Sequence, residues 1–121
     1  MAKLFALFIA IAALFAATAH AQSWPAKPVR IILPYPPGSG TDAFARVLAA
    51  QLTEQLGQSF VVDNRAGANG IIGTDIVAKA APDGYTLLHV TGSLVINPRI
   101  YRKLPYDVFR DLEPVTNIVL G

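Results

Sequence analysis

A turn-forming segment rich in glycine and proline, Tyr35–Asp42, is the feature that most constrains the fold. It follows an apolar run, Val29–Leu33, which has the composition of a strand covered on both faces. Ser39 and Asp42 have the spacing of a capping box, in which each side chain satisfies a backbone N–H at a helix start. The N–H groups that the box leaves unpaired can hold an anion. The segment is therefore predicted to be a tight turn into a helix N-terminus.

The chain beyond this turn alternates helix-like and strand-like segments. A helix is predicted over residues 43–56, with Gly57 at the C-cap, and a second helix before the stop residues Pro82–Gly84. Short strands are predicted at Phe60–Val62 and Tyr85–Val90. The residues expected to face the core are Phe44, Val47, Leu48, Leu52 and Leu56 in the first helix, and Ile72, Ile76, Val77 and Ala80 in the second.

The order strand, helix, strand, helix, strand predicts an α/β fold with a parallel sheet and right-handed crossovers. Ligands bind such sheets beyond the carboxyl ends of the strands, so the loops at 35–42, 64–70 and 91–93 should share one rim. Asn97 and Pro98 are interpreted as the N-cap and first position of a short helical turn. A further apolar strand is expected at Val115–Leu120, and because it would leave an open edge, we expect the chain to be the front part of a longer protein.

The first 21 residues have the features of a cleaved signal peptide. Lys3 gives a basic start, Leu4–Ala17 is apolar, and Ala19–Ala21 has the small-x-small form of a cleavage site. The apolar run is shorter than the about 20 residues that a spanning helix needs. We therefore expect cleavage after Ala21, a mature protein in the periplasm, and no membrane insertion after cleavage.

Composition excludes several kinds of function. The formal net charge is +2, which offers no basic surface for nucleic acid. There are no cysteines, so we expect neither disulfides nor a lipid-modified cysteine. Only His89 of the two histidines lies beyond the cleavage site, and no carboxylates cluster at ligand spacing, so we expect neither a metal nor another cofactor.

Two other interpretations of the glycines fit the sequence less well than a tight turn into a helix start. A nucleotide-binding P-loop needs a lysine where Thr41 stands, and Gly67, Gly70 and Gly73 have the wrong first spacing for a dinucleotide fingerprint. Arg65 is a separate candidate. It is interpreted as a surface-paired charge, and a role as counter-ion to the ligand is the lesser option.

A hydrolase is the alternative from a different functional class. Ser39, Asp42 and His89 are the residue types of a catalytic triad, although the glycine-x-serine-x-glycine elbow is missing. His89 is expected to lie within a strand, packed and hydrogen-bonded. An exported α/β hydrolase or transferase fragment that uses Ser39 stays open as the alternative.

Several ordered motifs carry a family resemblance. They are the run from Trp24 to Asp42 followed by Ala45 and Arg46, the run from Val62 to Gly73, and Pro82–Leu88. Asn97-Pro98 and Lys103–Asp107 continue the match. In these motifs the chain resembles the Bug family, the extracytoplasmic solute receptors of tripartite tricarboxylate transporters.

This resemblance implies a two-lobed periplasmic binding protein of type II, of which residues 22–121 are the amino-terminal part of the first lobe. Such a protein is not an enzyme: it captures a small carboxylate and passes it to membrane permease subunits. In such a site Asp42 is expected to act mainly as a cap, and Arg46 to matter less because it lies a turn inside the helix. The residues implied to bind the ligand are Tyr35, Pro36, Ser39, Gly40, Thr41, Asp42, Asn69, Gly70, Thr91 and Ser93.

We predict that the secreted form begins at Gln22, because the small-x-small site ends at Ala21. Mass spectrometry of the N-terminus in a periplasmic extract measures this directly. Recovery of the protein with Met1–Ala21 intact in a membrane fraction would contradict the prediction.

Overall fold

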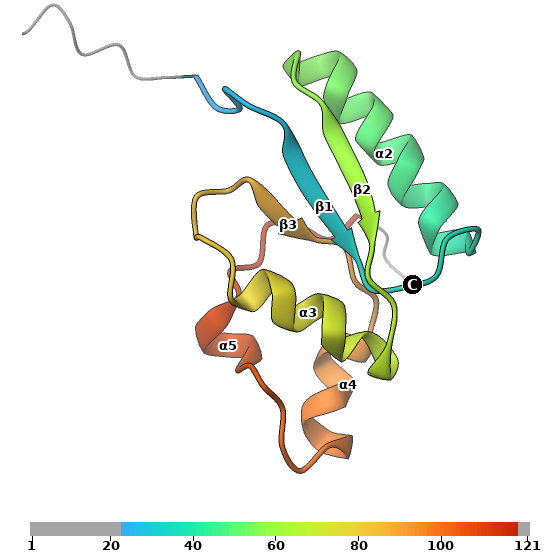
Figure 1. Cartoon of the computed structure of the whole chain (residues 1–121), viewed down its shortest axis with the longest axis vertical. Coiled ribbons are helices and arrows are strands. Elements are labelled where there is room, and N and C mark those ends of the chain that lie inside the picture. The colour runs from blue at the N-terminus through green and yellow to red at the C-terminus, as the bar shows by residue number, and fades with distance from the viewer. Residues whose placement is uncertain (1–22, 119–121) are drawn as a thin grey trace, which may run out of the picture.

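The fold is built around a parallel sheet of three strands in the order β2-β1-β3, in a computed structural model that describes residues 23–118 (Figure 1). The strands are β1 (Val29–Leu33), β2 (Phe60–Asn64) and β3 (Thr86–Leu88). β1 pairs in parallel with both neighbours, and its residues Val29, Ile32 and Leu33 have no exposed surface. The predicted α/β fold with a parallel sheet is therefore confirmed.

The strand boundaries differ from the prediction at both outer strands. β2 continues two residues beyond Val62, whereas β3 is shorter than Tyr85–Val90. Residues 115–118 pair with no strand in the part of the chain that the structure describes, so the strand predicted there is not found. The remainder of that strand, the signal peptide and its cleavage site lie outside the described residues.

Helices cover the sheet and follow its strands in the chain. The helices are α2 (Gly40–Leu56), α3 (Ile71–Ala78) after the short 3₁₀ turn η1 (Ala68–Gly70), α4 (Ser93–Ile100) and α5 (Val108–Asp111). In Figure 1, α2 runs beside β2, and it contacts both β2 and β1, whereas α3 contacts β1 and β3. α4 lies against η1, which brings the residues after β3 next to those after β2. None of the helices within residues 23–118 has the length and apolar character needed to cross a membrane.

The buried face of α2 agrees with the predicted one at Leu52 but differs from it at Phe44, Val47 and Leu56. Ala49 belongs to the core cluster around β1, and Leu52 packs against that cluster, while Ala45 is fully buried. Phe44 and Val47, which were expected in the core, are 40% and 64% exposed. Small residues let a helix approach a sheet closely, and the alanines of α2 form an apolar face of their own. Apolar spacing alone could not decide between the two faces.

The ends and interiors of the helices correct two further predictions. Gly57 caps α2 as predicted, with a left-handed φ of 71° and its N–H donating to Thr53 O at 3.0 Å. In α3, however, Ile72 is half exposed. α4 begins at Ser93, so Asn97 and Pro98 lie inside the helix and do not start it. The buried side chain of Asn97 is used for a tertiary contact in place of the predicted N-cap.

We predict that Gly73→Ala lowers the free energy of unfolding by ~1–3 kcal/mol, the usual cost of overpacking. An added Cβ at Gly73 would lie 2.8 Å from Pro34 Cβ and 3.0 Å from Arg65 O, so the strand end and α3 would have to separate. Denaturant titration measures the change. Gly92→Ala is the matched control, because the nearest atom to its added Cβ is 4.0 Å away. Equal stability of the two variants would show that α3 does not need this close approach.

Candidate functional site

The loops that follow the three strands meet at one edge of the sheet. The Tyr35 hydroxyl after β1 lies 2.6 Å from Thr91 Oγ1 and 3.0 Å from Ser93 Oγ, both beyond β3. Gly70, in the loop after β2, lies so close that an added Cβ would be 3.6 Å from Ser93 Oγ and 3.5 Å from Pro34 Cβ. The structure thus brings together residues from all three predicted loops.

The Tyr35 hydroxyl joins the first loop to the third. Besides its two contacts with Thr91 Oγ1 and Ser93 Oγ, it accepts the backbone N–H of Thr91 at 3.1 Å. A phenol has a single proton to donate and acts otherwise as an acceptor, so these three contacts occupy it. Tyr35 therefore holds the loops in place.

At the start of α2, one of the two hydrogen bonds of the predicted capping box is present. Ser39 is the N-cap, and its Oγ accepts the N–H of Asp42 at 3.2 Å, as predicted. The Asp42 carboxylate, however, accepts the N–H of Gly38 at 2.9 Å and not that of Ser39. Among residues 23–118, the N–H groups of Gly40 and Thr41 meet no acceptor. This helix start has the unpaired donors that an anion needs.

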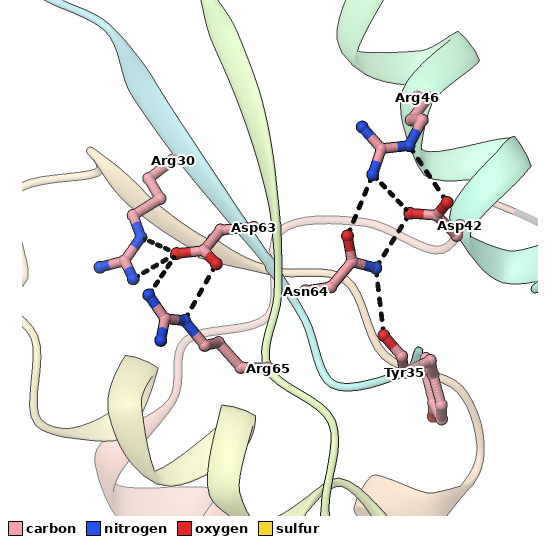
Figure 2. A network of polar contacts seen from close by, with 7 residues as sticks. All are labelled: Arg30, Tyr35, Asp42, Arg46, Asp63, Asn64 and Arg65. Atoms are coloured by element: carbon pink, nitrogen blue, oxygen red, sulfur yellow. Dashed lines mark hydrogen bonds and ion pairs between the residues drawn. The ribbon is translucent and has the colours of Figure 1, made fainter. Parts of the chain in front are cut away.

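The buried Asp42 carboxylate is the centre of a polar network that extends to the surface through Arg46 (Figure 2). Its Oδ2 accepts Arg46 Nε–H at 3.1 Å in addition to the Gly38 N–H, and its Oδ1 lies 2.9 Å from Asn64 Nδ2 and 3.0 Å from Arg46 Nη2. Asn64 also donates to the carbonyl oxygen of Tyr35 at 3.1 Å and accepts from Arg46 Nη2 at 3.0 Å. The end of β2 thereby fixes both the first loop and the first turn of α2.

This network keeps Asp42 ionised. The hydrogen bond from Arg46, followed by those from the Gly38 N–H and Asn64, lowers the pKa of Asp42 from 3.8 to about 2. The sequence predicted a cap but missed Arg46 and Asn64 as partners. The signal that could have found Arg46 is its spacing of four residues from Asp42, which places both on one helix face.

The second loop is held by a pair of asparagines. Asn69 has a left-handed backbone, with φ at 53°, a conformation that asparagine tolerates better than most residues. Its Nδ2 donates to Asn97 Oδ1 at 2.7 Å, and Asn97 Nδ2 donates to Asn69 O at 3.0 Å. Because Asn97 is 1% exposed, this exchange anchors the loop to the interior of α4. The sequence pointed to Asn69 but not to its partner.

A separate ion cluster lies on the other side of β2 from Asn64 (Figure 2). Asp63 accepts Arg30 Nε–H at 2.7 Å, also contacts Arg30 Nη2, and lies 2.9 Å from Arg65 Nε. Partial burial alone would raise the pKa of Asp63, but the two guanidinium groups outweigh it and hold the pKa below its usual value. Arg65 is thus a surface-paired charge, as predicted.

The residues of the imagined triad do not assemble. The hydrogen bonds of the Asp42 carboxylate come from Gly38, Arg46 and Asn64, and none comes from His89. His89 follows β3 and does not lie within it, and its ring packs edge-on against Phe44 with centroids 5.9 Å apart. Its Nδ1 is buried without a partner in the described part of the chain, so the expected side-chain hydrogen bond is missing there. Burial lowers the pKa of His89 below its usual value and so favours the neutral ring.

Within residues 23–118, the hollows lie away from the first and third strand-end loops, and no metal site is found. Two hollows of about 610 and 570 Å³ lie over β1 and β2 and between α2 and β2, and neither is lined by the strand-end loops at 35–42 and 91–93. Within residues 23–118, no group of three or more potential metal-ligating His, Cys, Asp or Glu side chains comes together. What the rim presents is backbone N–H groups and hydroxyls on one wall.

Solved structures with this fold define the class of protein. The periplasmic binding protein BugD is 38% identical, with a TM-score of 0.72 over 75% of this chain and 30% of BugD. MatC from Rhodopseudomonas palustris, solved with bound malate, is 34% identical, with a TM-score of 0.67 over 73% of this chain and 30% of MatC. The fold is that of part of a periplasmic binding protein.

The family follows from the sequence comparison. Residues 44–120 match the sequence model of TctC, the tripartite tricarboxylate transporter family receptor, and the chain belongs to this family. BugT from Bordetella pertussis is 49% identical over 114 residues, which make up 93% of this chain and 35% of BugT. The chain therefore spans about a third of the length of this relative. The resemblance to the Bug family is confirmed.

We predict that Asp42 makes stability depend on pH between about 4 and 2. Because its pKa is lower in the folded protein than the usual 3.8, the unfolded chain binds the proton more tightly. The contribution of Asp42 is therefore complete above about pH 4 and is lost as the pH falls through 2. Denaturant titrations of the complete receptor across this window should show a steeper loss for the wild type than for Asp42→Asn. Parallel curves would contradict the prediction, and Asp111, whose pKa is also about 2, contributes equally to both proteins.

Proposed function

We propose that this chain is the amino-terminal part of a periplasmic receptor that captures a small carboxylate for a tripartite tricarboxylate transporter. The observation that carries the proposal is the start of α2, where the N–H groups of Gly40 and Thr41 have no acceptor within residues 23–118. This helix start lies beyond the carboxyl end of β1, where ligands of open parallel sheets bind. Membership of the receptor family and the malate bound to MatC support a carboxylate as the ligand.

The ligand carboxylate rests on the N–H groups of Gly40 and Thr41. The helix dipole contributes about 0.3–1 kcal/mol, and each charge-assisted N–H contact about 1.5–3 kcal/mol. Hydroxyls at the same rim come from Ser39, Thr41, Thr91 and Ser93. Because the Tyr35 hydroxyl has one proton, at least one of Thr91 and Ser93 donates to it, and these two residues together keep at most one proton for the ligand. Pro36, Asn69 and Gly70 shape the surface around them.

Two of the residues that the resemblance implied as ligand contacts act indirectly, by positioning the loops. The Tyr35 hydroxyl is occupied by Thr91 and Ser93, and the Asp42 carboxylate by its four donors. Both groups position the loops against which the ligand lies, and neither has free capacity to bind it.

The second wall of the cleft comes from the remainder of the receptor. Residues 22–121 form part of the first lobe, and a second lobe closes over the ligand before the permease subunits receive it. Residues 1–21 direct export to the periplasm and are then removed. The receptor carries out no chemical reaction, and the comparisons with solute receptors support this role and not the hydrolase alternative. Saturable binding without release of product from ester substrates distinguishes the two.

We predict that Gly40→Val in the complete receptor weakens carboxylate binding roughly 10- to 150-fold, the equivalent of one charge-assisted N–H contact. An added Cβ at Gly40 meets no atom within 4 Å, so the fold accommodates it and the effect falls on the ligand. Calorimetric titration with succinate, malate and adipate measures the loss.

Ala43→Val is the matched control for this experiment, because it adds the same branched side chain one turn further along α2 at an exposed position. It should leave the affinity unchanged. A Gly40→Val receptor that binds as the wild type does would show that the ligand does not rest on this helix start.

A further inference from the structure

Asp42 presents an electrostatic problem for an anion site at the start of α2. It is the third residue of the helix, directly after Gly40 and Thr41. A helix N-terminus carries the equivalent of about half a positive charge, whereas an ionised carboxylate carries a full negative charge. Without compensation, the net field at this helix start would repel a carboxylate ligand.

The shape of the loop nevertheless depends on that carboxylate. Asp42 holds the Gly38 N–H at 2.9 Å and the Asn64 amide at 2.9 Å, and through Asn64 it reaches the carbonyl oxygen of Tyr35. A residue without an acceptor at position 42 would leave these donors unpaired. Asp42 is thus useful for the geometry of the loop and harmful for its charge.

Arg46 offsets the charge of Asp42 through a bidentate ion pair. Its Nε lies 3.1 Å from Asp42 Oδ2, and its Nη2 lies 3.0 Å from Asp42 Oδ1. The oxygen of the Asn64 amide accepts from the same Nη2 at 3.0 Å, which fixes the guanidinium in this orientation. Paired in this way, the two ions present almost no net charge to a ligand at the rim.

No other cation takes this role in the described part of the chain. Arg46 is the basic residue that forms an ion pair with Asp42, whereas Arg30 and Arg65 are paired with Asp63 on the other side of β2 (Figure 2). The charge at the helix start therefore depends on one side chain.

We propose that Arg46 is a positioning residue: by neutralising Asp42, it lets the start of α2 accept an anion while Asp42 shapes the loop. This inference rests on the proposed function, because it concerns the same carboxylate site. It gives Arg46 a larger role than the expectation that this residue matters less than the helix start because it lies a turn inside the helix. Arg46 touches no ligand in this mechanism and acts through Asp42.

A double-mutant cycle that removes each charge in turn tests the proposal in the complete receptor. Wild type, Arg46→Gln, Asp42→Asn and the double variant are titrated with succinate, malate and adipate in low-salt buffer. We expect Arg46→Gln to lose at least tenfold in affinity, and the double variant, in which neither group is charged, to regain most of that loss. Arg46→Lys keeps the charge and should stay within about threefold of the wild type.

A purely structural role for the pair predicts a different pattern. In that case the double variant would bind no better than Arg46→Gln, and this result would overturn the proposal. An Arg46→Gln receptor with wild-type affinity would overturn it as well. If Arg46→Gln does not fold, the double variant and Arg46→Lys decide the question, because a charge mechanism requires both to bind. Lys79→Gln is the matched control, since it breaks the exposed i,i+4 ion pair of α3 and should leave the affinity unchanged.

A second readout does not involve the ligand. NMR titration of the Asp42 carboxyl should give a pKa of about 2 in the wild type and a clearly higher value in Arg46→Gln. An unchanged pKa would overturn the inference even if the receptor binds carboxylates. If the wild-type receptor binds none of the three carboxylates, the proposed function fails, and the inference fails with it.

Discussion

The pairing of β1 with a parallel strand on each side determines where everything else lies. Val29 to Leu33 pair in register with Phe60 to Asn64, and the middle of β1 pairs with β3. Because all three strands run the same way, their carboxyl ends reach one edge, and the loops that follow them must meet there. The rim is thus a consequence of strand direction, and the helices bring their N-termini to it because each crossover starts from a strand end.

Side-chain hydrogen bonds then give the rim its detailed shape. Asn64 fastens the first loop to the end of β2, Tyr35 fastens it to the third loop, and Asn97 fastens the second loop to α4. Each of these bonds joins residues 28 to 56 positions apart in the chain. Their geometry comes from the packing of the sheet and not from any local turn. The positions of the three loops relative to one another are therefore set by the sheet.

The sequence predicted the parts of this arrangement that depend on local pattern. The strand Val29–Leu33, the N-cap at Ser39 and the left-handed Gly57 follow from composition and spacing, and the structure has all three. Asn64 and Asn97, the partners of Asp42 and Asn69, were missed because they depend on which elements become neighbours, whereas the spacing of Arg46 from Asp42 was a local signal that could have been used. The buried face of α2 was only partly predicted for a related reason: Leu52 packs on the core as expected, but close packing on β1 and β2 buries Ala45 and Ala49 in place of Phe44 and Val47.

The occupied hydroxyl of Tyr35 has a consequence for the thermodynamics of binding. Loops that must become ordered around a ligand lose conformational entropy at that moment, and the loss weakens the affinity. Here the first and third loops are already joined before any ligand arrives, by contacts of 2.6, 3.0 and 3.1 Å. Their entropy is lost during folding and not a second time on binding, so this wall of the cleft is preorganised.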